Sequence, residues 1–198
     1  MLLKLMNKIS SVFFTAALIL MCASCSEKDT EVVMKTPYGD IVVEIYLKEA
    51  PVTASNFMRY VNEDRFKDAV FYRVVTPDNQ PDNDVKIEVI QGGLFEDEHP
   101  DALPPIEHET TKDTGIKHLD GTISMARNEP GSASSEFFIC VGDQPELDFG
   151  GKRNPDGQGF AAFGRVVKGM DIVRKIQHLP SKDQMLLQKI PIKIVKRN

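Results

Sequence analysis

The stretch SSEFFICV (residues 134–141), together with SMARN (residues 124–128) just upstream, predicts a β-strand of aromatic and aliphatic residues. Alternate side chains on a strand share a face, so Glu136, Phe138 and Cys140 lie together and the opposite face is apolar. A carboxylate beside an aromatic ring predicts a concave surface for a ligand that is partly apolar and partly polar. The alternative is an ordinary strand whose terminal charge lies in water.

Two further strand signals carry polar groups suited to ligand binding. AVFYRVV (residues 69–75) is almost wholly β-branched or aromatic and is interrupted by one cation, Arg73. An arginine in such a run either reaches solvent at the rim or aims its planar donors at a ligand carbonyl. IEVIQGG (residues 87–93) ends a strand with Gln91 and two glycines, which allow a neighbouring chain to approach closely.

The rest of the chain adds short strands and two helices. An N-terminal proline and apolar periodicity predict a helix over residues 51–62, and an apolar stripe predicts another over residues 168–177. The predicted strands cover residues 32–36, 40–47, 69–75, 85–91, 121–126, 135–141, 160–167 and 190–196. This pattern fits a mainly β fold, a closed eight-stranded antiparallel barrel capped by two α-helices. Loops are predicted over residues 76–84 and 95–119.

The order of these pieces resembles the cyclophilins. FYRVV, VIQGG, ISMARN, SSEFFICV, FAAFGRVV and KGMDIV follow one another as in that family, over residues 32–195. The resemblance implies the same capped barrel and a peptidyl-prolyl cis-trans isomerase without cofactor or metal. Residues 76–84 (TPDNQPDND) replace a much shorter connection of the family. This insertion is expected to be a solvated surface loop, and the alternatives are that it restricts or extends the groove.

Cis–trans isomerisation of a peptide bond before proline requires groups that position the substrate and does not require a reactive side chain. Rotation about a peptide bond has a barrier of roughly 18 to 20 kcal/mol because the nitrogen lone pair is delocalised into the carbonyl. At proline the cis and trans forms differ by about 0.5 to 1 kcal/mol, yet exchange takes on the order of 10 to 100 s. An apolar slot for the ring and donors for the flanking backbone can stabilise the twisted state without a nucleophile.

The resemblance also implies a role for each polar site residue. Arg73 is the expected catalytic residue, with its guanidinium directed at the prolyl carbonyl and nitrogen. Gln91 matches the glutamine that steadies this arginine and the substrate. The backbone of Ala126 and Arg127 is expected to pair with the bound peptide.

The apolar slot follows the family pattern with several departures. Phe138 matches the floor of the slot and Leu147 one wall. Val89 stands where a methionine is usual and makes a smaller wall, and Phe160 stands where a histidine is frequent. Glu88 replaces an aromatic residue. These departures predict an altered peptide preference and weak cyclosporin affinity.

Two carboxylates depart from the pattern as well. Glu146 occupies a position where many members have a tryptophan, and Glu136 replaces a glutamine. An ionised carboxylate accepts hydrogen bonds but donates none. Because Glu136 is expected close to Arg73 and beside the slot, we predict that it favours substrates with a cationic residue near the proline.

The first residues predict export and a lipid anchor. Residues 1–24 have two lysines and an apolar run too short to span a bilayer, as in a lipoprotein signal peptide. Small residues before Cys25 imply cleavage there and lipidation of its sulfur, and Cys22 is the alternative position. Residues 25–31 are a predicted tether and residues 32–198 the folded domain. The expected location is the envelope of a Gram-negative cell, on the periplasmic face or at the outer membrane or cell surface, with the lipid as the one membrane contact.

Composition narrows the partners. Removal of the signal deletes two lysines from a chain of formal net charge −5, which gives −7, so nucleic acid is not expected to bind. Cys140 is then the lone cysteine of the domain and is predicted to be a buried thiol without a disulfide. The expected partners are unfolded or extended proline-containing polypeptides, bound by a monomer.

Two alternatives stay open at this point. The same groove could hold proline segments of a partner as a non-catalytic chaperone or docking module. A lipocalin-like carrier has a similar strand count but requires an open cavity, whereas two apolar helices predict a filled interior. No metal site is predicted, because the histidines are dispersed without the spacing of a zinc pair: His99, His108, His118 and His178.

Overall fold

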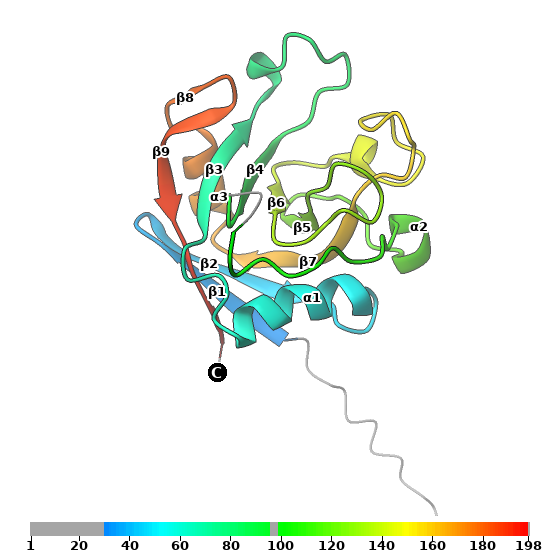
Figure 1. Ribbon diagram of the computed structural model, residues 1–198. Helices are drawn as coiled ribbons and strands as arrows, with labels where there is room; N and C mark the ends of the chain where they lie inside the picture. Colours follow the sequence, from blue (N-terminus) through cyan, green and yellow to red (C-terminus); the bar gives the residue numbers. More distant parts are fainter. Residues whose placement is uncertain (1–29, 96–98, 198) are drawn as a thin grey trace, which may run out of the picture.

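The computed structural model describes residues 30–95 and 99–197 (Figure 1). Within these residues the helices are α1 (Pro51–Asn62), α2 (Thr111–Thr114) and α3 (Met170–Gln177). The strands are β1 (Thr30–Thr36), β2 (Gly39–Ile45), β3 (Val70–Val75), β4 (Val89–Gly93), β5 (Thr122–Met125), β6 (Phe137–Cys140), β7 (Ala161–Lys168), β8 (Ser181–Lys182), β9 (Met185–Pro191) and β10 (Lys193–Lys196). None of the described helices has both the length and the apolar character that crossing a bilayer requires.

The predicted signal peptide, most of the tether and the lipidation position Cys25 lie outside the described residues. The first strand, β1, begins at Thr30, two residues before the predicted start of the domain.

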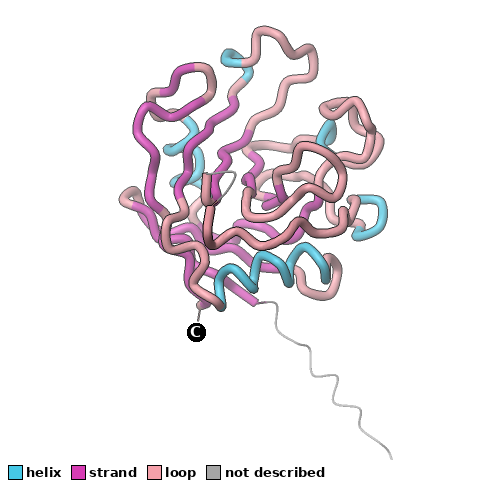
Figure 2. Tube along the Cα trace, viewed as in Figure 1, coloured by secondary structure: helices cyan, strands magenta, loops and turns pink. Residues whose placement is uncertain are grey.

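All strands join one antiparallel sheet in the order β10-β1-β2-β7-β5-β6-β4-β3-β9-β8 (strands magenta in Figure 2). The strands β9 and β10 are separated only by Ile192, yet β9 pairs with β3 and β10 pairs with β1. The hydrogen-bonded order therefore has two ends, at β10 and β8. The predicted closed barrel of eight strands is not confirmed, because the described residues form ten strands in a sheet that is not closed.

The two extra strands come from the C-terminal segment. The predicted strand over residues 190–196 is divided at Ile192, whose N–H donates to the carbonyl of Ala69 (2.9 Å). The β8–β9 hairpin has no predicted counterpart, because its residues are mostly exposed and do not alternate. Its turn is made by Asp183 and Gln184, with φ of 50° and 69°, a left-handed pair that suits a two-residue hairpin.

The predicted loop over residues 95–119 also contains local structure. Four residues form α2, with the Thr110 side chain accepting from the N–H of Asp113 and Gly115 ending the helix at φ of 75°. A helix of one turn is too short to give a periodic sequence pattern. The loop is tied to α1 by Glu109, whose carboxylate accepts the N–H groups of Val52 (3.1 Å) and Thr53 (2.6 Å).

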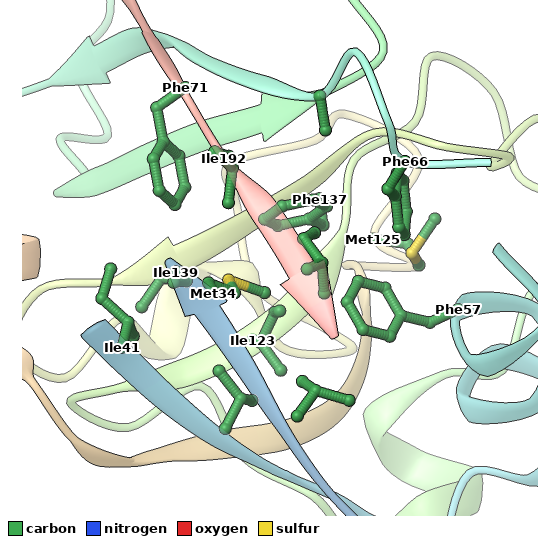
Figure 3. Packing of buried hydrophobic residues seen from close by; sticks show 14 of the residues in the cluster. Met34, Ile41, Phe57, Phe66, Phe71, Ile123, Met125, Phe137, Ile139 and Ile192 are labelled. Atoms are coloured by element: carbon green, nitrogen blue, oxygen red, sulfur yellow. The ribbon is translucent and has the colours of Figure 1, made fainter. Parts of the chain in front are cut away.

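The inside of the sheet is filled by one apolar core (Figure 3). Phe57 of α1 packs against three other rings of this core, with ring centroids 5.3 Å from Phe66, 5.6 Å from Phe137 and 5.1 Å from Phe163. Each of these rings is 3 % exposed or less. A filled interior is the opposite of the open cavity that a lipocalin-like carrier requires.

The two faces of β6 belong to two different clusters, as the alternation in its sequence predicts. Phe137 and Ile139 lie in the main core. Phe138 and Cys140 lie in a second cluster on the outer face, with Leu147. Cys140 is a free, buried cysteine, as predicted, and burial raises the pKa of its thiol well above the usual value.

Candidate active site

A groove of about 590 Å³ collects side chains from β3, β4 and β6 and from the loops around them. The residues to which the sequence assigns catalysis or peptide contacts line it: Arg73, Val89, Gln91, Ala126, Arg127, Glu136, Phe138, Leu147 and Phe160. Glu88 and Glu146, two other departures from the family pattern, are not among the lining residues. The predicted guanidinium and the predicted apolar slot therefore share one cavity.

The floor of this groove is apolar. Phe138 is 4 % exposed and lies on the second cluster together with Leu147 and Val89. Phe160 sets its ring edge-on to Phe138, with centroids 5.3 Å apart and an angle of 89° between the planes. A flat apolar floor bounded by a perpendicular ring is a surface against which a proline ring can pack.

Arg73 is held beside this floor by neutral amides. Its Nη1 donates to Gln91 Oε1 (2.7 Å), and its Nε and Nη2 donate to Gln184 Oε1 (3.0 and 2.5 Å). Burial lowers the pKa of Arg73, but a guanidinium stays protonated in proteins. Neutral acceptors fix the side chain without cancelling its charge, which stays available to a ligand.

Gln184 is a site residue that the sequence does not reveal. It lies in the β8–β9 turn. Its side-chain Nε2 donates to the backbone carbonyl of Asn79 (3.0 Å), and its backbone carbonyl accepts the N–H of Val74 (2.8 Å). Only the pairing of β9 with β3 brings this turn to the guanidinium of Arg73. No local motif in the sequence marks that approach.

Tyr72 is the second missed residue, and a β-bulge explains why. In the β3–β4 ladder Phe71 pairs with Gly92 and Arg73 pairs with Gln91, so Tyr72 is an extra residue on β3. Simple alternation would send Tyr72 and Arg73 to opposite faces, whereas both line the groove.

The Tyr72 hydroxyl links the glutamine to the carboxylate. It accepts from Gln91 Nε2 (2.6 Å) and donates to Glu136 Oε2 (2.6 Å). Burial, followed by the charge of Glu136, raises the pKa of Tyr72, so the hydroxyl stays a donor. Arg73, Gln91, Tyr72 and Glu136 thus form one hydrogen-bonded chain along the groove.

The Glu136 carboxylate is surrounded by neutral donors. Besides Tyr72, its Oε1 accepts from the N–H of Phe95 (3.1 Å) and from Ser135 Oγ (3.1 Å). Gly93 makes room for it: φ is +147° there, and a Cβ would lie 2.5 Å from Glu136 Oε1. The close approach predicted for the two glycines after Gln91 is therefore real.

The Arg127 side chain is neutralised within the protein. Its Nη1 and Nη2 donate to the two Asp156 carboxylate oxygens (2.8 and 3.0 Å), and its Nε and Nη2 donate to the carbonyl of Gly159 (2.9 and 2.6 Å). The hydrogen bonds from Arg127 hold the pKa of Asp156 below its usual value. This guanidinium supports the loop beside Phe160, and the N–H of neighbouring Ala126 donates to the carbonyl of Glu136 (2.8 Å).

A buried polar triad lies under the slot. His118 Nδ1 is 2.8 Å from Asp148 Oδ1 and Nε2 is 2.9 Å from Ser124 Oγ, while its ring stacks on Phe138 with centroids 5.9 Å apart. Burial lowers the pKa of His118, so the ring is neutral near pH 7. Because Ser124 and the His118 side chain are wholly buried, this arrangement supports the floor and offers no nucleophile to a substrate.

A second cluster around a histidine lies next to the groove: its three residues do not line the groove, but the lining residue Ala102 donates its N–H to the carbonyl of His99 (2.9 Å). His99, Asp68 and Asp101 present ligand atoms within 4.8 Å of one another. The ammonium of Lys67 lies 2.9 Å from Asp101 Oδ2 and already supplies a positive charge there. We therefore assign no metal to this cluster.

The fold and the groove together define a class. A mainly β domain that holds a charged arginine beside an apolar slot is what the resemblance to the cyclophilins predicts. The sequence profile of the family "Cyclophilin type peptidyl-prolyl cis-trans isomerase/CLD" matches residues 31–197. The chain belongs to this family and is an isomerase.

Curated relatives agree with this assignment. The chain is 36 % identical over 171 residues to a peptidyl-prolyl cis-trans isomerase of Acinetobacter baylyi, which covers 85 % of this chain and 82 % of the relative. It is 34 % identical over 163 residues to peptidyl-prolyl cis-trans isomerase B of Escherichia coli, with 81 % and 92 % covered.

Solved structures share the fold. A cyclophilin of Cryptosporidium parvum matches with a TM-score of 0.66 at 20 % identity, over 86 % of this chain and 98 % of that one. The same protein crystallised in the presence of the dipeptide Ala-Pro matches with a TM-score of 0.65 at 21 % identity, with 85 % and 99 % covered.

Proposed function

We propose that this groove accelerates rotation of X–Pro bonds in unfolded or extended polypeptides of the cell envelope, with Arg73 as the catalytic residue. The observation that carries the proposal is the position of the Arg73 guanidinium. It lines the same groove as the floor ring of Phe138, and neutral amides hold it.

The proposed mechanism is stabilisation of the twisted amide. The proline ring packs on Phe138 between Leu147 and Phe160, which fixes one side of the rotating bond. The two N–H groups of Arg73 not used by Gln91 and Gln184 donate to the prolyl carbonyl oxygen and nitrogen. As the bond twists, the nitrogen lone pair localises and becomes a better acceptor. These bonds are therefore stronger in the transition state than in the ground state, which is the condition for acceleration.

Two-dimensional exchange NMR on a capped peptide with one proline tests the proposal. Uncatalysed exchange takes about 10 to 100 s. Addition of the purified full chain at a catalytic ratio should make cis–trans exchange much faster than this. Binding without faster exchange would select the alternative, a non-catalytic chaperone or docking module that uses the same groove.

Glu136 is proposed to favour a cationic residue near the proline. Among the described residues its carboxylate accepts hydrogen bonds from neutral donors alone, which orient the charge without cancelling it. The test compares turnover of peptides with Lys or Glu before the proline, in the native chain and in Glu136→Gln. The Lys-to-Glu ratio should fall in the variant, and an unchanged ratio would remove the idea.

The envelope location is proposed from the N-terminal sequence and rests on processing before Cys25. Mass spectrometry of the mature N-terminus and membrane fractionation of cells test it. Cys25→Ser should release the protein from the membrane fraction, and the matched change Cys22→Ser should not. Release by Cys22→Ser alone would move the anchor to that position.

A further inference from the structure

Three arginines line the groove, and they differ in how their charge is balanced. Arg127 forms an ion pair with Asp156, and its side chain is 1 % exposed. Within residues 30–95 and 99–197, neither Arg73 nor Arg153 forms an ion pair with a carboxylate. The groove therefore contains two cations whose charge the protein does not neutralise.

Arg153 connects its own loop to the segment that holds the insertion over residues 76–84. Its Nη1 donates to Gln80 Oε1 (2.9 Å) and to the carbonyl of Val85 (2.6 Å), both in the segment between β3 and β4 that holds the insertion. Its own backbone N–H donates to the carbonyl of Glu146 (3.1 Å). These contacts hold the guanidinium in the wall of the groove, on the side of Ile87.

This anchoring leaves donors for a ligand. A guanidinium has five N–H groups, and the two hydrogen bonds of Arg153 use those of Nη1. Its Nε and Nη2 form no hydrogen bond with any described residue. The neighbouring Asn154 also lines the groove, and its Nδ2 is buried without a hydrogen-bond partner in the described part of the chain. Unsatisfied donors at one wall favour a ligand that brings oxygen acceptors.

Electrostatics favours an anionic ligand at this wall. Arg73 and Arg153 line the same groove, and their like charges repel each other. Burial, followed by the charge of Arg73, lowers the pKa of Arg153 accordingly. A carboxylate bound near them relieves that repulsion and matches the planar donor pair of an arginine. The carboxylate of the protein that lines the groove, Glu136, is already held by Tyr72, Phe95 and Ser135.

We propose that Arg153 is a specificity-determining residue, which binds the carboxylate of an Asp or Glu side chain that flanks the proline of the peptide. The inference rests on the proposed function, because it assumes that a proline peptide occupies the groove. It gives the insertion a role as well: the segment of Gln80 and Val85 extends the groove and presents the cation.

The test uses capped peptides with a C-terminal amide, so that a side chain supplies the one carboxylate. Asp replaces Ala in turn at each of the three positions on either side of the proline, and exchange NMR gives kcat/KM for each peptide with the full chain. At one position or more the Asp-to-Ala ratio should be about threefold or higher at low salt and should fall as salt screens the charges. An Asp-to-Ala ratio near one at every position would overturn the proposal.

Variants assign the effect to Arg153. Arg153→Gln should bring the ratio to about one, while the matched change Lys152→Gln, which removes an exposed charge one residue away, should leave it as in the native chain. Arg153→Lys keeps the positive charge even though it loses the guanidinium contacts to the loop. Its Asp-to-Ala ratio should therefore exceed that of Arg153→Gln. Equal ratios in the Lys and Gln variants, or a native ratio in Arg153→Gln, would contradict the proposal.

Exchange of the Ala peptide distinguishes the proposed isomerase function from the proposed role of Arg153. Failure to accelerate its exchange would count against the isomerase mechanism and not against Arg153. In that case titration of the Asp and Ala peptides by NMR gives their Kd values. The Asp peptide should then bind about threefold or more tightly to the native chain and equally with Ala to Arg153→Gln, and equal binding to both proteins would reject the proposal.

Discussion

Removal of the Arg73 guanidinium is the perturbation with the clearest expected effect. Three of its five donors are used by Gln91 and Gln184, which leaves two for the substrate. A hydrogen bond from a charged donor contributes about 1.5 to 3 kcal/mol, and only the part that strengthens as the amide twists raises the rate. If about 1.4 kcal/mol of that sum is specific to the transition state, Arg73→Ala lowers kcat/KM about tenfold. Loss of a fully preorganised donor would give about 100- to 1000-fold.

The assay is cis–trans exchange of a capped proline peptide, with folding checked by circular dichroism and thermal unfolding. Arg73→Ala should stay folded, because Gln91 and Gln184 are only half-buried and water can replace the lost donor. Arg59→Ala is the matched control: it removes an exposed arginine whose partner is Glu63, one helical turn away, and should retain native turnover. A folded Arg73→Ala protein with native kcat/KM would refute the assignment of Arg73.

Further predictions concern the support of the site, the core and the response to pH. Gln184→Ala should lower kcat/KM about three- to tenfold, because it releases the Arg73 guanidinium. In an Arg73→Ala background the same change should have no further effect on kcat/KM. Additive losses in the double variant would show that Gln184 does not act through Arg73. Phe57→Ala should lower the free energy of unfolding by about 3 to 5 kcal/mol in urea titrations, because this buried ring packs against three others. A loss below about 1 kcal/mol would contradict this account of its packing. Burial lowers the pKa of His118 in the folded protein, whereas in the unfolded chain this histidine has its ordinary pKa of about 6.5. The unfolded chain therefore binds more protons as pH falls below about 6.5. The stabilisation contributed by His118 is complete above that pH and declines below it. His118→Gln should flatten the slope of unfolding free energy between about pH 7 and 5, and an unchanged slope would mean that His118 is not held neutral.

Local sequence patterns located most of the fold and the predicted groove. Alternation in SSEFFICV assigned Phe137 and Ile139 to the core and Phe138 to the outer cluster, because a strand exposes successive side chains on opposite faces. The same rule misplaces Tyr72, since a bulge adds one residue to β3 and brings Tyr72 to the face of Arg73. A bulge depends on the pairing of two strands, which the sequence of one strand does not encode.

The sequence by itself, through short-range periodicity and side-chain type, determined three features of this protein. They are a strand that carries one arginine, an aromatic floor for the groove and a helix whose apolar side packs into the core. The tertiary structure alone decided which groups meet. Gln184 reaches Arg73 only because β9 pairs with β3, and Arg153 reaches Gln80 only because two loops far apart in the chain fold to the same wall. Such contacts arise from long-range hydrogen bonds and packing, so their partners become visible only when the whole chain is folded.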